Sequence, residues 1–326
     1  MAKKLGLGGL IVGLVTLGWY VLQVKGKQIE KFISPVGQIM EQPVAKYAFE
    51  RLRQRQYQAT QINLDRVIEE KPKYTAYLFS FLSDNQKVTG QANIPKISKK
   101  APVIVMLRGY VDKEVYTTGI GTRKAAAVLS ENGFVTVAAD FLGYGESDPE
   151  SNDMLEARFE KLVTALNLLA SVCSLPQADC QKVGLWGHSN GGYIALSVLA
   201  ISGREIPTTL WAPVSKPFPY DILYYSDDLS DRGKLLRAAV AEFERSFNAD
   251  DYSVQSYYKW IKAPVQIHQG TADEAVPKGW SDALVNDLKP DVTDITYHVY
   301  SVADHNLEPN WNTVVQRDVA WFRKHL

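Results

Sequence analysis

The chain has 326 residues, of which 46% are hydrophobic and 22% are charged, a composition typical of a globular protein with a sizeable core. Its 36 lysines and arginines balance 36 aspartates and glutamates, so the sequence offers no broad basic surface for binding nucleic acid. The length fits one large α/β domain with an insertion as well as two smaller domains.

An apolar segment without charges occupies residues 5–24, with lysines on both sides. A helix of this length rises about 30 Å, which matches the hydrocarbon core of a bilayer. We therefore predict that residues 1–24 form a single-pass N-terminal membrane anchor that contacts the lipid bilayer through residues 5–24. We expect the domain that follows to lie on the extracytoplasmic side.

Two questions about this segment stay open. A cleaved signal peptide would have a shorter apolar region and a cleavage site of small residues, which Gln23-Val24-Lys25-Gly26 resembles poorly. The flanking lysines are similar in number, so the positive-inside rule hardly discriminates between the two orientations.

The two cysteines, Cys173 and Cys180, allow two interpretations. They could close a short disulfide in an oxidising compartment, or they could remain free thiols. Two cysteines with no histidine at ligand spacing do not predict a zinc site, and the sequence implies no metal or organic cofactor.

The order of strands and helices predicts the fold class. Residues 25–73 show no motif and are interpreted as a stalk or lead-in, and the main domain is predicted over residues 74–326. Strands are expected at residues 74–80, 87–94, 102–107, 134–139, 183–186, 208–212, 265–268 and 296–302. Helices are expected at residues 122–132, 153–171, 191–201, 235–247, 280–288 and 314–325. This alternation predicts a mostly parallel central sheet with helices on both faces.

One long segment interrupts the alternation. Residues 216–262 contain no predicted strand, one predicted helix and many aromatic residues. An insertion after the strand at 208–212 would lie over the carboxyl ends of the strands. We therefore predict a helical lid, whose aromatic side chains mostly pack it onto the body.

The strongest chemical signal is Gly187-His188-Ser189-Asn190-Gly191, which follows a strand and opens a helix. In this context the G-x-S-x-G pattern is a nucleophile elbow, a sharp turn that exposes the serine hydroxyl at the edge of the sheet. Gly187 and Gly191 relieve the crowding that such a turn creates. We predict that Ser189 is a catalytic nucleophile.

A serine hydroxyl is a weak nucleophile and needs a base, and the chain has five histidines. His188 lies inside the elbow, where its side chain is expected to point away from the serine. His268 and His298 lie within strands, and His325 is next to the C-terminus. His305 remains, in a loop between the last strand and the last helix, and we predict that it is the base.

The third member should be a carboxylate that orients the imidazole and stabilises its charged form. Asp273 follows the strand at 265–268, which is the expected position. Glu274 is expected to point elsewhere, and Asp304 adjoins the histidine too closely to reach its ring well. We predict the triad in the chain order Ser189, Asp273, His305.

Acyl transfer also requires donors for a developing oxyanion. One predicted donor is the backbone N–H of Asn190, directly after the nucleophile. The second is the backbone N–H of Tyr110, in a loop where Gly109 allows a close approach to the substrate. Arg108 in the same loop could fix the loop, attract an acidic substrate group or be solvated, and we favour the structural role.

Four motifs together resemble the prolyl oligopeptidase-like catalytic domain of the α/β-hydrolase superfamily, which includes peptidases and esterases. They are GHSNGG at 187–192, DFLGYGESD at 140–148, QGTADEAVP at 269–277 and ADHNL at 303–307. The resemblance implies an α/β-hydrolase fold over residues 74–326.

The chain departs from the family pattern in two places. The family's usual His-Gly pair is Arg108-Gly109 here, and the residues between the anchor and the first hairpin are too few for the β-propeller of the large family peptidases. We therefore predict a carboxylesterase-like serine hydrolase that acts on a small-molecule ester. A peptidase for short peptides is the alternative, and a catalytically silent membrane-tethered scaffold is a third reading.

Overall fold

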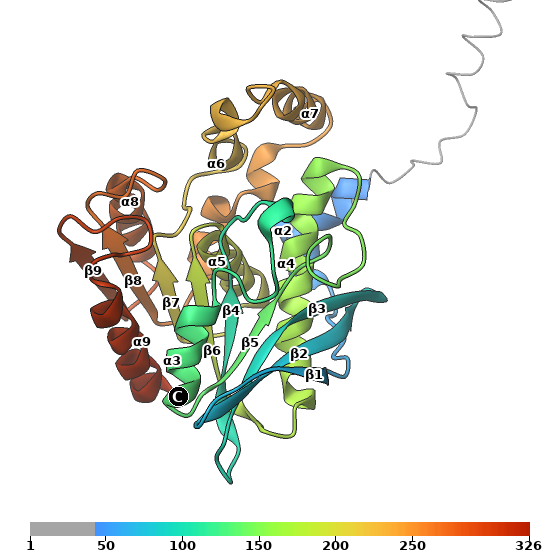
Figure 1. Ribbon diagram of the computed structural model, residues 1–326. Helices are drawn as coiled ribbons and strands as arrows, with labels where there is room; N and C mark the ends of the chain where they lie inside the picture. The colour runs from blue at the N-terminus through green and yellow to red at the C-terminus, as the bar shows by residue number, and fades with distance from the viewer. Residues whose placement is uncertain (1–42) are drawn as a thin grey trace, which may run out of the picture. The chain divides into compact units, whose positions relative to one another are not determined.

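The computed structural model describes residues 43–326 (Figure 1). The predicted membrane segment, residues 5–24, lies outside the described residues. Within residues 43–326, no helix combines the length and the apolar character needed to cross a bilayer.

A single nine-stranded sheet forms the centre of the domain, in the order β1-β2-β3-β5-β4-β6-β7-β8-β9. Its strands are β1 (Asn63–Glu70), β2 (Tyr74–Ser83), β3 (Gln86–Pro95), β4 (Ala101–Leu107), β5 (Val135–Ala139), β6 (Ala178–His188), β7 (Thr208–Trp211), β8 (Val265–Gly270) and β9 (Ile295–Tyr300). The pairs from β1 to β5 are antiparallel, and all pairs from β5 through β4 to β9 are parallel. The structure thus confirms the predicted mostly parallel sheet.

Helices cover both faces of this sheet, as predicted (Figure 1). The main ones are α3 (Arg123–Glu131), α4 (Met154–Ser171), α5 (Asn190–Ser202), α8 (Lys278–Leu288) and α9 (Trp311–His325). Along β4, Ile104 and Met106 pack with α3 and α9, whereas Val103 and Val105 pack in the core that contains α4, α5 and α8. A strand buried on both faces needs apolar side chains at every position, which explains the continuous apolar run at 102–107.

The N-terminal boundary of the domain differs from the prediction. Residues predicted as a lead-in up to 73 contribute β1 to the sheet, and a 3-10 helix (Pro43–Tyr47) and α2 (Phe49–Gln54) pack against the body. The ring of Phe49 stacks on Tyr257 with centroids 5.0 Å apart. The strand β1 escaped the sequence analysis because it is an exposed edge strand rich in charged residues, with no apolar run and no regular alternation.

The segment between β7 and β8 is helical, as expected for the lid. It contains α6 (Tyr220–Leu223), α7 (Lys234–Glu244) and three 3-10 helices at Ser226–Asp228, Ala249–Tyr252 and Val254–Trp260. Phe218, Phe243 and Tyr252 pack around Phe159 of α4, with ring centroids 5.2–6.3 Å from it. These aromatic contacts hold the insertion on the body, which is the role that we expected for most of its aromatic residues.

Cys173 and Cys180 are both exposed free thiols. The structure therefore corresponds to the free-thiol interpretation of the pair.

A buried carboxylate ties the last helix to the sheet. Asp318 of α9 is fully buried. Its oxygens accept hydrogen bonds from side chains of three adjacent strands, namely Trp186, Thr209, Trp211, Gln266 and His268. These strands are β6, β7 and β8, which lead directly to the predicted catalytic loops. Because every donor points at one residue, the network depends on that residue.

We predict that Asp318→Ala lowers the free energy of unfolding by about 3–5 kcal/mol, because it leaves several buried donors without an acceptor. Urea denaturation of the variant and the wild type would measure this difference. The control is Glu242→Ala, which removes an exposed pair with Arg245 and should change stability by less than about 1 kcal/mol. Equal midpoints for Asp318→Ala and the wild type would refute the assignment.

Candidate active site

Ser189 occupies a strained turn between β6 and α5. Its backbone has φ 56° and ψ −122°, a conformation that side-chain-bearing residues rarely adopt. Such strain is expected of a nucleophile elbow, in which the turn lifts the serine side chain out of the sheet edge. The local geometry therefore matches the motif that predicted it.

Three glycines make this turn possible. A Cβ atom on Gly191 would lie 1.8 Å from the carbonyl oxygen of Leu107, and one on Gly187 would lie 2.6 Å from the carbonyl oxygen of Gly191. A Cβ atom on Gly109 would lie 3.1 Å from Cβ of Ser189 and 3.6 Å from its Oγ. The end of β4 and the elbow therefore pack backbone against backbone, and Gly109 lies directly beside the serine side chain.

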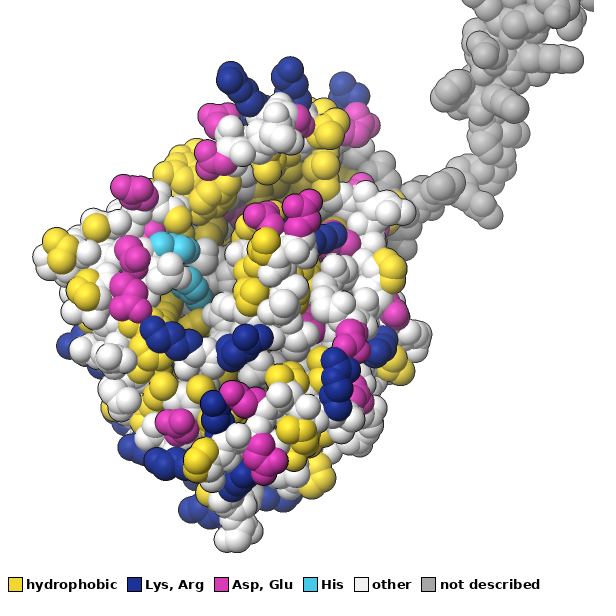
Figure 2. Space-filling model, viewed as in Figure 1, with side chains coloured by type: hydrophobic (Ala, Val, Ile, Leu, Met, Phe, Trp, Pro, Cys, Tyr) yellow, Lys and Arg dark blue, Asp and Glu magenta, His cyan; other side chains and the backbone are white. Residues whose placement is uncertain are grey.

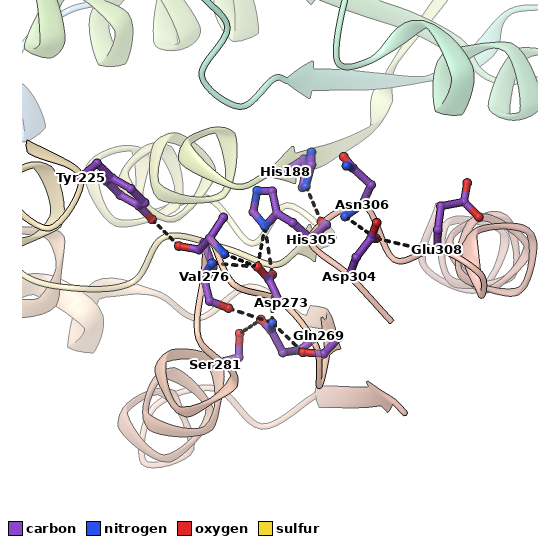
Figure 3. Close-up of polar contacts among 12 residues, drawn as sticks. His188, Tyr225, Gln269, Asp273, Val276, Ser281, Asp304, His305, Asn306 and Glu308 are labelled. Carbon is purple, nitrogen blue, oxygen red and sulfur yellow. Dashed lines mark hydrogen bonds and ion pairs between the residues drawn. The ribbon is translucent and has the colours of Figure 1, made fainter. Parts of the chain in front are cut away.

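The imidazole of His305 is bonded to the carboxylate of Asp273 (Figure 3). Nδ1 of His305 lies 2.9 Å from Oδ2 and 3.1 Å from Oδ1 of Asp273. A carboxylate accepts, so Nδ1 carries the proton, and Nε2 of a neutral ring is left free to accept one. Within residues 43–326, Nε2 of His305 makes no hydrogen bond, and 24% of the side chain is exposed.

Asp273 is held firmly by its own loop. Oδ1 accepts hydrogen bonds from the backbone N–H groups of Ala275 and Val276 at 3.0 Å and 2.8 Å, and Oδ2 accepts from Nε2 of Gln269 at 3.1 Å. Burial by itself would raise the pKa of Asp273, but the hydrogen bonds from His305, Val276 and Gln269 outweigh it and lower the pKa below its usual value. The carboxylate therefore stays ionised beside the imidazole.

The two competing carboxylates lie elsewhere. Glu274 is exposed and does not contact His305. Asp304 accepts hydrogen bonds from the backbone N–H groups of Asn306 and Glu308, both at 2.9 Å, and so closes the loop that carries His305 (Figure 3).

His188 has a role that the sequence analysis missed. Its Nε2 donates a hydrogen bond of 2.9 Å to the carbonyl oxygen of His305, and the two rings lie 4.8 Å apart between centroids (Figure 3). Burial, and then the neighbouring His305, lower the pKa of His188 to about 4, so the ring is neutral at physiological pH. The elbow thus reaches the His305 loop through His188. The sequence predicts that the His188 side chain points away from the serine, but it does not reveal that the His305 loop is its partner.

His188 directly precedes Ser189 and bonds to the backbone of His305, so the elbow and the His305 loop are in contact. Among the described residues, no hydrogen bond joins Oγ of Ser189 to the imidazole of His305. Catalytic hydrogen bonds are often long or poorly aligned before substrate binds and tighten in the Michaelis complex. The structure therefore joins Asp273 to His305 and brings the elbow against the His305 loop, and activation of Ser189 by His305 stays a prediction.

The loop after β4 is fixed by Arg108, which is only 5% exposed. Its guanidinium donates hydrogen bonds to the carbonyl oxygens of Gly109 at 3.0 Å and Asp140 at 2.9 Å. It also lies over the rings of Tyr116 and Tyr144, at 4.5 Å and 4.2 Å from their centroids. These contacts support the structural role that we favoured for Arg108.

One predicted oxyanion donor follows the serine in the chain, and the other follows Gly109, which packs beside the serine. Asn190 begins helix α5, where backbone N–H groups have no partner inside the helix. Tyr110 follows Gly109, and its side chain is 69% exposed while its hydroxyl donates to Asp112. Within residues 43–326, no group accepts a hydrogen bond from either backbone N–H, so both are available to a ligand.

Comparison with known proteins agrees with this geometry. The prolyl oligopeptidase family (Peptidase_S9) matches residues 121–326. The chain belongs to this family. It is a serine hydrolase, as the sequence motifs predicted.

Curated relatives match over part of their length. A probable dipeptidyl peptidase 4 of Aspergillus fumigatus is 28% identical over 158 residues, which are 48% of this chain and 20% of that protein. An uncharacterized 31.7 kDa protein of Escherichia coli is 29% identical over 117 residues, which are 34% of this chain and 37% of that protein. The chain thus spans about a fifth to just over a third of these relatives.

Solved structures confirm the α/β-hydrolase fold. An acetyl xylan esterase from Thermoanaerobacterium matches with a TM-score of 0.63 and 17% identity, over 86% of this chain and 94% of that chain. One from Paenibacillus matches with a TM-score of 0.64 and 15% identity, over 90% and 98%. The acylaminoacyl peptidase of Pyrococcus horikoshii matches with a TM-score of 0.58 and 19% identity, over 77% of this chain and 41% of that chain.

We predict that His188→Ala lowers kcat/KM by about tenfold, because the His305 loop loses a partly buried hydrogen bond and a ring contact. His188→Gln keeps a donor and should recover part of the loss. Equal losses in His188→Ala and His188→Gln would contradict this role of the His188 hydrogen bond.

Proposed function

We propose that this serine hydrolase is carboxylesterase-like and cleaves a carboxylic ester of a small substrate through an acyl-enzyme. Oγ of Ser189 attacks the carbonyl carbon while Nε2 of His305 takes the hydroxyl proton, and Asp273 stabilises the imidazolium. The backbone N–H groups of Tyr110 and Asn190 bind the oxyanion. His305 then protonates the departing alcohol, and a water molecule, deprotonated by His305, releases the acid and restores Ser189.

One observation carries this proposal. Asp273 is bonded to Nδ1 of His305 in a loop that contacts the elbow, and Ser189 sits in that elbow with the positive φ of a nucleophile. Three loops, after β6, β8 and β9, supply these side chains at the carboxyl edge of the sheet. A carboxylate that fixes the histidine tautomer in a loop against the nucleophile elbow is the arrangement needed for general-base activation.

The extent of the matches supports an esterase. The two acetyl xylan esterases match over 86% and 90% of this chain, whereas the fungal dipeptidyl peptidase matches over 48% of it.

An aromatic cluster beside the triad suits an apolar part of the substrate. Tyr220 and Tyr224 of the lid are 50% and 40% exposed, and Tyr224 packs edge-on against Trp280 with centroids 4.8 Å apart. Tyr225 donates a hydrogen bond to the carbonyl oxygen of Ala275, in the loop that holds Asp273. Figure 2 shows histidine side chains at the edge of a hollow beneath the lid, and hydrophobic side chains line its upper wall. We propose that this hollow receives the substrate.

A membrane-anchored serine peptidase for short peptides is the second candidate, favoured by the family match and the dipeptidyl peptidase relatives. Recognition of a peptide amino terminus would need carboxylates inside the site. Asp227 of the lid is 85% exposed and pairs with Arg237 at 2.6 Å, so it resembles a surface ion pair. This observation weighs against an aminopeptidase.

To test the proposal, purified protein is assayed on p-nitrophenyl esters and on aminoacyl and dipeptidyl p-nitroanilides. We expect ester turnover to exceed anilide turnover and Ser189→Ala to reduce it by about 10⁴-fold or more. Asp273→Asn should cost about 10³- to 10⁴-fold, because the imidazole loses its tautomer control. Faster anilide turnover would indicate a peptidase instead. If neither esters nor anilides are hydrolysed in a Ser189-dependent way, the catalytically silent scaffold is the remaining interpretation.

We also propose that residues 5–24 anchor the protein in a membrane with the hydrolase domain on the extracytoplasmic side. The support is the uncharged length of the segment and its flanking lysines. The full chain should resist extraction from membranes by alkaline carbonate, and protease added to intact cells should degrade the domain. Release by carbonate would contradict the anchor, and full protection from protease would contradict the orientation.

A further inference from the structure

Four cationic side chains gather beside the elbow, on the loop after β4 and on helix α4. Around the ring of Tyr144 lie Cζ of Arg108 at 4.2 Å, Nζ of Lys113 at 5.7 Å and Nζ of Lys161 at 5.9 Å from the centroid. Arg158 lies one turn before Lys161 on the same helix and faces the same cluster. Like charges repel, so such a group needs counter-charges.

Each carboxylate nearby has a partner, and only Oδ1 of Asp221 is buried without one among the described residues. Glu150 pairs with Lys113 at 2.5 Å, and Asp221 of the lid pairs with Arg158. The carboxylate of Asp140 accepts hydrogen bonds from three hydroxyl groups, those of Thr89, Tyr116 and Thr118. Within residues 43–326, the ammonium of Lys161 makes no hydrogen bond and no ion pair. Among the described residues, each of the other three cations has a hydrogen-bonded or ion-paired partner, and Lys161 has none.

Two further donors beside Lys161 are also unsatisfied. Nε of Arg108 and Nε of Arg158 are buried and make no hydrogen bond with any described residue. Burial lowers the pKa of Lys161 to about 8; Glu150 opposes this shift, and Arg108, Arg158 and Lys113 add to it. Lys161 as a whole residue is only partly buried. The cluster therefore has an excess of positive charge that a bound anion would relieve.

Two members of this cluster contact residues that adjoin the elbow. Arg108 holds the carbonyl of Gly109, which lies beside Ser189. Arg158 lies over the ring of Tyr193, at 4.5 Å from its centroid, and the backbone N–H of Tyr193 donates to the carbonyl oxygen of Ser189 at 3.4 Å. Arg108 and Arg158 therefore connect the cluster, through Gly109 and Tyr193, to the elbow that carries Ser189.

We propose that Lys161, with Arg158 and Arg108 beside it, binds a carboxylate of the substrate, so that the preferred ester carries a free carboxylate group. One unpaired ammonium with single N–H donors from two guanidinium groups fits a singly charged planar anion better than a dianionic phosphate. This inference rests on the proposed esterase function, and it adds the class of substrate.

The test compares matched pairs of esters on the full chain. In the first pair the acyl group differs, p-nitrophenyl hemiglutarate against p-nitrophenyl pentanoate. In the second pair the leaving group differs, p-acetoxybenzoate against its methyl ester. Wild-type protein should favour the carboxylate-bearing member of at least one pair. In Lys161→Met the ratio of kcat/KM for anionic to neutral ester in that pair should fall by about 10- to 100-fold, and Lys161→Arg should restore part of it.

Lys182→Met is the matched control, because it removes the same charge from an exposed position in β6. It should leave the ratio as it is in the wild type. A ratio that is the same in wild type and Lys161→Met for both pairs overturns the inference, and so does an equal fall in the control. If the protein hydrolyses neither the anionic nor the neutral esters, the proposed esterase function itself has failed.

Inhibition by free dicarboxylate tests the same site without a variant. Glutarate should inhibit hydrolysis of the neutral ester competitively, and its uncharged diamide should inhibit at least about tenfold more weakly. Equal inhibition by both compounds, or none by glutarate, overturns the inference even if Lys161→Met does not fold.

Discussion

The contact on which this site depends is the backbone packing between the end of β4 and the turn that carries Ser189. With the space of a Cβ at Gly191 already filled by the carbonyl of Leu107, no other residue fits there without moving one of the two segments. That packing forces the turn, gives Ser189 its positive φ and places Gly109 beside the serine. Because β4 and β6 are neighbours in the sheet, the oxyanion loop and the nucleophile come to one point without any further adjustment.

The other half of the site is assembled by the next strands of the same sheet. The loops after β8 and β9 carry Asp273 and His305, and these strands are adjacent and parallel. Below them, Asp318 joins β6, β7 and β8 to α9, so the strands that lead to Ser189 and Asp273 share one buried anchor. His188 adds a second connection, because it links the elbow to the backbone of His305. The catalytic loops are therefore held from two sides.

Local signals in the sequence predicted much of this arrangement. The elbow could be read from five consecutive residues because its strain demands glycines at fixed positions. His305 followed from its place in a loop after the last strand, and Asp273 from the strand before it. The structure brings these two side chains together as expected, and it keeps Glu274 and Asp304 away from the imidazole.

Features made by distant residues could not be read in the same way. The strand β1 is charged and exposed, so it lacks the apolar pattern by which buried strands are recognised. The partner of His188 lies on another loop, and no periodicity reveals it. Lys161 looks like an ordinary polar position in α4 until the fold sets it beside Arg108, which comes from a different loop. Such convergence depends on the strand order, which the sequence pattern left undetermined.

The central claim is that Ser189 is a nucleophile activated by His305, and active-site labelling tests it most directly. Folded protein is treated with a fluorophosphonate, and the modified peptide is located by mass spectrometry in the wild type and in His305→Ala. The account predicts a single adduct on Ser189, formed at least about 10³-fold more slowly in the variant. An unmodified Ser189 in folded wild-type protein, or equal labelling rates in both proteins, would contradict it.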